Sequence, residues 1–295
     1  MKAVRVKNLE ESTPITDSVH QAEALGAKAE AGIGTRLKDG FLFVAKRGLL
    51  AWVLLLVVWQ IAATVMGGSF LPTPLKTLAG AQELIKSGTL QSDLLVSLFR
   101  ILCGWLIGTI IAVPLGLVIG QFKIVRWLIE PLINFFRFVF AIGFLTLFLL
   151  WFGVGEVSKV ALIIYATMFP IIVNTISGVI AIDPLKIESA QSQGASKFQI
   201  FYSVVIPSSV PSIFTGVRLG LGGAIIAIVA AEMLAAQNGI GYLIYTSRLY
   251  YRTDWIFVGI FILGFIGFLS DTLLRLFGNV VLKKYGISDS RRTTK

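Results

Sequence analysis

Residues 101–120 read ILCGWLIGTIIAVPLGLVIG, twenty consecutive residues without a charged side chain. A helix of this length rises about 30 Å, which matches the hydrocarbon core of a bilayer. The whole chain agrees, because 56% of its 295 residues are hydrophobic, only 14% are charged, and its mean hydropathy is +0.83. A soluble domain carries about 25% charged residues. The sequence therefore predicts an all-α membrane protein and excludes a cytosolic enzyme, a secreted disulfide scaffold and a disordered chain.

Apolar runs of similar length occur on both sides of this segment. Together they predict six membrane spans: Gly48–Met66, Ile101–Gly120, Leu132–Trp151, Val157–Ile180, Pro211–Ala235 and Trp255–Leu276. The first run begins too far from Met1 for a cleaved secretory signal, so we expect an uncleaved anchor helix. Between the first two spans, Leu75–Ser87 mixes apolar and charged residues, which predicts an amphipathic surface helix that starts after Pro74.

The basic residues are distributed unevenly about these spans. If both termini are cytoplasmic, 20 of the 26 Lys and Arg residues lie on the inner side. The outer side then holds Lys76, Lys86, Arg100, Lys159, Arg248 and Arg252. Because cytoplasmic loops carry the excess of Lys and Arg, this distribution predicts a multi-pass protein with both termini inside. The net charge of +10 then reflects topology, and nucleic acid is not an expected partner.

The chain divides by composition into three parts. We expect residues 1–47 to form a polar cytoplasmic tail, residues 48–285 the transmembrane domain, and residues 286–295 a basic cytoplasmic tail. The chain contains one cysteine, Cys103, and one histidine, His20. They allow neither an internal disulfide nor a His/Cys metal cluster, so we expect no metal site and no catalytic residues.

The segment at about residues 181–210 is longer than the other connections and lies on the inner side. Asp183–Pro184 has the pattern of a helix N-terminus, and Gly194 suits a helix C-terminal stop. Ser196–Gln199 then has the spacing of a capping box for a second helix, which we expect Pro207 to end. These helix signals alone fit a plain connector equally well.

The residues of this segment resemble the EAA loop of ATP-binding-cassette (ABC) importer permeases. In that family Glu-Ala-Ala is followed by Gly and then by Ile-x-Leu-Pro, and here Glu188–Ala190 reads ESA, Gly194 follows, and Val204–Pro207 reads VVIP. Further landmarks, similar to those of sulfonate, taurine, nitrate and bicarbonate permeases, are Leu71–Pro74, Leu98–Arg100, Trp151–Gly155, Thr215–Leu219 and Ala231–Met233. The resemblance covers roughly residues 50–285.

The chain departs from this subfamily after Arg137. Members usually carry prolines there, whereas residues 138–143 of this chain read FVFAIG. We therefore expect a straighter third span with a more aromatic pore-facing surface.

The resemblance implies a permease of a prokaryotic inner membrane that forms the path for a small anion such as nitrate, bicarbonate, a sulfonate or taurine. It implies ABC ATPase subunits, an extracytoplasmic substrate-binding protein and a second permease copy as partners, with membrane lipid around them. The ATPase binds the ATP and Mg, because this chain has no GxxxxGK[ST] motif, and we expect no cofactor on the chain itself. The residues implied in ATPase coupling are Glu188, Ser189, Ala190, Gly194, Lys197, Phe198, Phe201 and Pro207, with Phe198 or Phe201 as an apolar anchor.

Several polar or aromatic residues inside the predicted spans are candidates for the path or its gate. They are Asn134, Phe140, Thr146, Asn174, Arg218 and Glu232. Ionisable groups in a membrane are costly and therefore suggest function. For Glu232 a structural hydrogen bond is the competing interpretation, and Arg218 has the alternative of reaching the cytoplasmic headgroups. We expect Asp271 to pair with Arg275 one helical turn away.

Three pairs of glycines have the spacing of close helix packing: Gly104/Gly108, Gly116/Gly120 and Gly216/Gly220. Hinges and a pore lining are the other interpretations of these residues. A secondary active transporter or channel for a small solute is the alternative function, although repeated intramembrane carboxylates and broken helices, which favour it, are few in this sequence. A membrane-embedded enzyme would need a catalytic cluster that no motif here supplies.

Overall fold

The computed structural model describes residues 51–68 and 70–284, with side chains described up to residue 278, and their regular structure is entirely helical. The chain divides into two compact units, the first ending at Val65 and the second beginning at Met66. The described part of the first unit belongs to the helix Ala51–Met66. In the second unit the elements are α2 (Pro74–Lys86), α3 (Thr89–Gln121), α4 (Lys123–Phe136), α5 (Ala141–Phe152), α6 (Glu156–Ile180), α7 (Pro184–Ser192), α8 (Lys197–Ile200), the π-helical turn η1 (Phe201–Val205), α9 (Ile206–Ala235), α10 (Ile240–Leu249) and α11 (Thr253–Lys284).

The predicted all-α membrane class is confirmed, but six full spans are not. Among the described residues four helical stretches are long and apolar enough to cross a bilayer: α3, α6, α8 through α9, and α11. The pair α4 and α5 makes a fifth span only if the two bent helices are taken together. Ala51–Met66 is a shorter apolar helix. Residues 48–50 of the predicted first span and both predicted tails, with their boundaries, lie outside the described residues.

The amphipathic helix predicted after Pro74 is confirmed as α2. Thr73 caps it, because its hydroxyl accepts the backbone N–H of Lys76. α2 packs on α11, and Arg252 beside α11 ion-pairs with Glu83 of α2. The hydrogen bond from Arg252 holds the pKa of Glu83 below its usual value.

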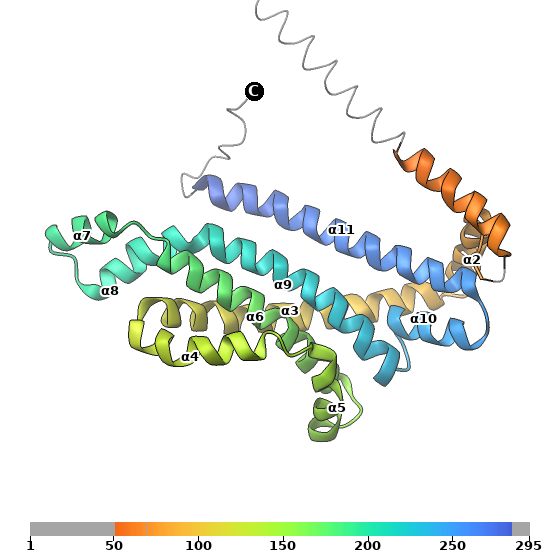
Figure 1. The fold of residues 1–295 in the computed structure, drawn as a ribbon, viewed down its shortest axis with the longest axis horizontal. Coiled ribbons are helices and arrows are strands. Elements are labelled where there is room, and N and C mark those ends of the chain that lie inside the picture. The colour runs from red at the N-terminus through yellow and green to blue at the C-terminus, as the bar shows by residue number, and fades with distance from the viewer. Residues whose placement is uncertain (1–50, 69, 285–295) are drawn as a thin grey trace, which may run out of the picture. The chain divides into compact units, whose positions relative to one another are not determined.

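The centre of the second unit is α6, which packs against α3 on one side and α9 on the other (Figure 1). The predicted glycine pairs make this packing possible. A Cβ added at Gly116 of α3 would lie 2.6 Å from Cβ of Thr175, and one at Gly120 would lie 2.8 Å from Cβ of Val179. Gly216 and Gly220 of α9 face α6 in the same way. The packing interpretation of these glycines is therefore confirmed.

Replacing Gly116 by alanine should destabilise the protein by about 1–3 kcal/mol, because the new methyl group overlaps Thr175 in a close-packed interface. Gly222→Ala is the matched control, since a Cβ at that position of α9 meets nothing within 4 Å. Thermal unfolding of both variants in detergent measures the difference. Equal melting temperatures would mean that α3 and α6 are not in close contact.

The prediction of a straighter third span is wrong. The chain breaks after α4 and turns by 95° into α5, although no proline lies between Arg137 and Phe140. A side chain of α6 compensates for the broken helix, since the Tyr165 hydroxyl donates a hydrogen bond of 2.8 Å to the Phe136 carbonyl. A break inside an apolar environment is stable when its freed backbone groups find such partners. A tertiary contact therefore stabilises a break that contains no proline.

The prediction that Pro207 ends the second loop helix is also wrong. The helix runs without interruption from α8 through η1 into α9. In η1 the N–H of Ile206 bonds to the carbonyl of Phe201, five residues back. This wider turn accommodates a proline that has no N–H of its own, and Pro207 then occupies the first turn of α9.

Candidate functional site

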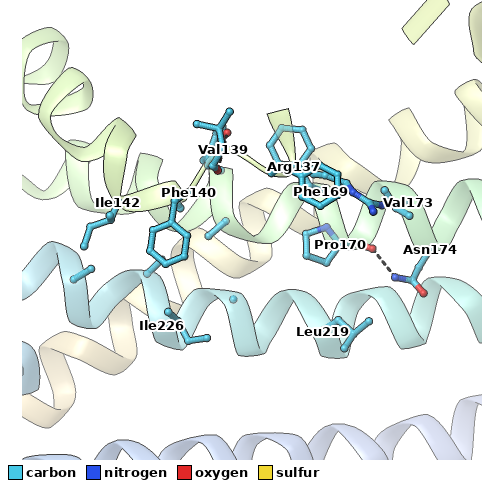
Figure 2. Close-up of a pocket in the computed structure, with 17 residues that line it drawn as sticks. Arg137, Val139, Phe140, Ile142, Phe169, Pro170, Val173, Asn174, Leu219 and Ile226 are labelled. Atoms are coloured by element: carbon cyan, nitrogen blue, oxygen red, sulfur yellow. Dashed lines mark hydrogen bonds between the residues drawn. The ribbon is translucent and has the colours of Figure 1, made fainter. Parts of the chain in front are cut away.

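A pocket opens beside the break between α4 and α5 (Figure 2). Its volume is about 520 Å³, within the range of small-molecule sites. Residues 137–142 form one wall, α6 contributes the segment 165–174, and α9 contributes residues from Leu219 to Ala230. The pocket thus lies where irregular backbone meets two central helices.

The lining of this pocket combines aromatic rings with a single cation. The rings come from Phe138, Phe140, Tyr165 and Phe169, and the cation is Arg137. In Figure 2 the Arg137 side chain extends from the break toward α6, and the Phe140 ring extends toward α9. None of the lining residues is an aspartate or a glutamate.

Arg137 lies at the C-terminal end of α4, has an exposed side chain, and differs from four basic residues of the long helices. Arg100, Lys159, Arg218 and Arg275 each pair with a carboxylate. Among the described residues Arg137 has no carboxylate at ion-pair distance, and its guanidinium lies 4.7 Å from the centre of the Phe138 ring. Because Arg137 also lines the pocket, its guanidinium is available there to a mobile anion or to water.

A second polar cluster joins α3, α6, α9 and the start of α10. Arg100 is 1% exposed and donates to Glu232 at 2.8 Å and to Glu156 at 2.6 Å. The fully buried Glu232 also accepts from the Ser97 hydroxyl and from the Gly241 N–H. We call Ser97, Arg100, Glu156 and Glu232 the Arg100 cluster. Because every buried charge in it is paired or hydrogen-bonded, it can fix the ends of three helices to one another.

The segment α7 to α8 projects at the end of the long helices opposite α2 and α10 (Figure 1). The Asp183 side chain caps α7, and Ser196 and Gln199 form the predicted capping box of α8. Gly194 stands between the two helices with φ of +81°, a conformation that favours glycine. The two predicted helix starts and the turn at Gly194 are therefore confirmed, whereas the predicted end of the second helix is not.

The exposed surface of this loop carries two stacked aromatic rings. Phe198 is 75% exposed and Tyr202 is 67% exposed, and their ring centres lie 6.5 Å apart with an interplanar angle of 20°. Phe201, one of the two predicted anchors, packs instead against the buried cluster that includes Val205. Glu188, Ser189 and Lys197 are exposed, and Ala190 is half-buried. Tyr202 was not among the predicted coupling residues, although its i+4 spacing from Phe198 was an available signal.

The residues predicted for the path fall into three groups. Phe140 and Asn174 line the pocket. Asn134 and Thr146 line separate surface hollows, beside Trp127 and Phe144 respectively. Arg218 pairs with Asp271 at 2.7 Å, while Glu232 lies in the Arg100 cluster. The expected Asp271–Arg275 pair is confirmed at 3.0 Å.

Arg137, Tyr165 and Phe169 also line the pocket but were not predicted from the sequence as path residues. The signal for Arg137 was a charge inside an otherwise apolar predicted span. Tyr165 and Phe169 gave no comparable signal, because aromatic residues at helical spacing usually belong to a core.

Comparison with known families decides the class of the protein. Residues 112–285 match the family of binding-protein-dependent transport system inner membrane components. This chain belongs to that family. The permease is 38% identical over 228 residues to a probable ABC transporter permease protein of Brucella melitensis, a match that covers 77% of this chain and 89% of the relative.

Two further relatives have names that state a substrate. The permease is 35% identical to the taurine transport system permease protein TauC of Escherichia coli, over 75% of this chain and 83% of the relative. It is 33% identical to a putative aliphatic sulfonates transport permease protein, SsuC, of Bacillus subtilis, over 80% of this chain and 87% of the relative. The permease is therefore a multi-pass transport component of an inner membrane, in the group that includes taurine and sulfonate permeases.

Proposed function

We propose that the permease forms the translocation path of an ABC importer for a small organic anion of the sulfonate and taurine class, and that the pocket at the α4–α5 break lies on this path. The observation that carries the proposal is the unpaired Arg137 in a pocket lined by a broken helix. Irregular backbone within a membrane is tolerated where it lines a cavity, and broken helices form the substrate sites of many transporters. Nitrate and bicarbonate are the inorganic alternatives within the same group.

Energy for transport comes from separate ABC ATPase subunits, which bind ATP and Mg and dock on the α7–α8 loop. The exposed Phe198 and Tyr202 rings support this assignment, because exposed aromatic side chains are enriched at protein interfaces. Gly194 sets the turn between α7 and α8, and Glu188 and Lys197 are exposed charges on the same loop.

The orientation follows from the charge distribution. The α7–α8 end, both chain termini and most basic residues face the cytoplasm. The end with α2, α10 and the Arg100 cluster then faces outward, toward an extracytoplasmic substrate-binding protein. A second copy of the permease completes the path as a homodimer.

Co-purification tests this proposal directly. Full-length tagged permease, co-expressed with an ABC ATPase subunit from its own genome, should retain that subunit. Phe198→Ala/Tyr202→Ala should weaken the complex at least about thirtyfold, the effect of losing an interface hot spot of about 2 kcal/mol. The control is Tyr250→Ala/Tyr251→Ala, which removes two aromatic residues exposed by 75% and 90% at the opposite end.

Two outcomes would contradict the proposal in different ways. If the wild-type permease retains no ABC ATPase subunit, the importer assignment is wrong. If the Phe198/Tyr202 variant binds as tightly as the wild type and the control, the ATPase docks on another surface.

A further inference from the structure

The pocket at the α4–α5 break offers one strong electrostatic contact to a ligand. Arg137 provides a planar guanidinium that binds a sulfonate or carboxylate by paired hydrogen bonds. The other polar side chains are uncharged: the Tyr165 hydroxyl donates to the Phe136 carbonyl, and one N–H of the Asn174 amide donates to the Pro170 carbonyl. A single acidic group on the ligand therefore satisfies the charge of the pocket.

The same lining disfavours a ligand that also carries a positive charge. Taurine is a zwitterion, and its ammonium group needs a carboxylate or free carbonyl oxygens to replace its water. No aspartate or glutamate lines the pocket, and the Pro170 carbonyl already accepts a hydrogen bond from the Asn174 side chain. Arg137 would moreover repel the ammonium group.

The remaining surface suits an apolar body rather than a bare inorganic anion. Four aromatic side chains line the pocket together with Val139, Ile142, Val173, Leu219 and Ile226. Its volume of about 520 Å³ leaves most of this surface uncovered by an ion as small as nitrate. Burying apolar ligand surface here contributes about 25 cal/mol for each Å² removed from water.

We propose that this pocket selects an organic monoanion, a sulfonate or a carboxylate, that has an apolar or aromatic body and no ammonium group, with Arg137 binding the acid group and the Phe138, Phe140 and Phe169 rings contacting the body. This inference rests on the proposed function, because it assigns a ligand to the pocket placed on the path. The FVFAIG segment at residues 138–143 provides two of the three rings, so the aromatic character is built into the break itself.

Protection of an introduced cysteine tests the assignment without transport. The full-length permease carries Cys103→Ser and Ile226→Cys in lipid nanodiscs, since Ile226 lines the pocket and is 70% exposed. The rate of labelling by N-ethylmaleimide is measured against the concentration of four probes: benzenesulfonate, methanesulfonate, taurine and nitrate. We expect benzenesulfonate to protect at a concentration at least about tenfold lower than each of the others, a difference of about 1.4 kcal/mol.

Variants of Arg137 separate its role from a general effect on the fold. Arg137→Gln should raise the protecting concentration of benzenesulfonate at least about tenfold, because the charge-assisted hydrogen bonds are lost. Arg137→Lys, which keeps the charge without the planar fork, should lie between this variant and the wild type. Arg126→Gln on α4 is the control, since Arg126 does not line the pocket, and it should leave protection unchanged.

Equal protection by all four probes, absence of protection, or protection that survives Arg137→Gln would each overturn the inference. The assay uses neither ATP nor a partner subunit, so its failure is distinct from failure of the importer proposal. A permease that binds its ATPase but shows no selective protection contradicts only the ligand assignment. A permease that shows selective protection but binds no ATPase contradicts only the proposed function.

Discussion

Replacing Arg100 by methionine is expected to lower the free energy of unfolding by about 3–5 kcal/mol, the largest stability effect that the structure predicts for a single substitution. The reason is Glu232, whose side chain is fully buried and has Arg100 as its ion-pair partner. Removal of the guanidinium leaves this carboxylate charged without a counter-ion, and Glu156 loses the same partner. Unfolding in dodecyl maltoside, followed by tryptophan fluorescence, measures the change.

Two further variants test that explanation. Arg100→Met/Glu232→Leu should be less destabilised than Arg100→Met alone, because the unpaired buried charge is gone. Arg275→Met is the matched control, since Arg275 is about half exposed and pairs with Asp271 in the C-terminal half of α11. We expect this variant to lose at most about 1 kcal/mol of unfolding free energy. If Arg100→Met unfolds as the Arg275 variant does, the Arg100 cluster does not hold the helix ends together.

Replacing Gly194 by aspartate is expected to reduce substrate uptake at least about tenfold while the protein remains in the membrane at normal abundance. A Cβ at Gly194 meets nothing within 4 Å, so the fold has room for the new side chain. The substitution nevertheless places a carboxylate on the proposed ATPase-docking loop and strains a turn with φ of +81°. Uptake by cells and the amount of inserted permease are measured together.

The control for this variant is Gly88→Asp. Gly88 also has a positive φ, of +76°, and a Cβ there also meets nothing within 4 Å, but it lies between α2 and α3 at the opposite end. Gly88→Asp should therefore transport normally. Normal uptake by Gly194→Asp would remove the coupling role from the loop, and equal losses in both variants would attribute the effect to backbone strain alone.

The sequence was sufficient for the features that depend on local rules. Hydropathy predicted the membrane class, the glycine spacing predicted close packing at those helix faces, and cap residues predicted the helices of the α7–α8 loop. In each case the physical cause lies within a few consecutive residues or a simple repeat. The predicted second span was shorter than α3 because polar residues such as Asp93 and Arg100 interrupt the apolar run. Partners elsewhere in the fold, the Gly239 N–H and the Glu232 carboxylate, satisfy them.

The features that depend on distant residues were not predictable in this way. The break after Arg137 requires Tyr165, which follows it by 28 residues, and the pocket exists only because that break faces α6 and α9. Glu232 has its role because Arg100 reaches it across 132 positions of the chain. The prediction that Pro207 ends a helix failed because the π-helical turn η1 changes the backbone hydrogen-bond register just before this proline.

Transport by the purified system is the most direct test of the central proposal, that this permease is the path of an ATP-driven importer for an organic anion. The permease is reconstituted in proteoliposomes with its ABC ATPase and its substrate-binding protein, and uptake of a radiolabelled sulfonate bound by that protein is measured. We predict accumulation that requires ATP and Mg and that falls to the background in Gly194→Asp. Accumulation that proceeds without ATP, or that an ion gradient drives in the absence of the ATPase, would contradict the account.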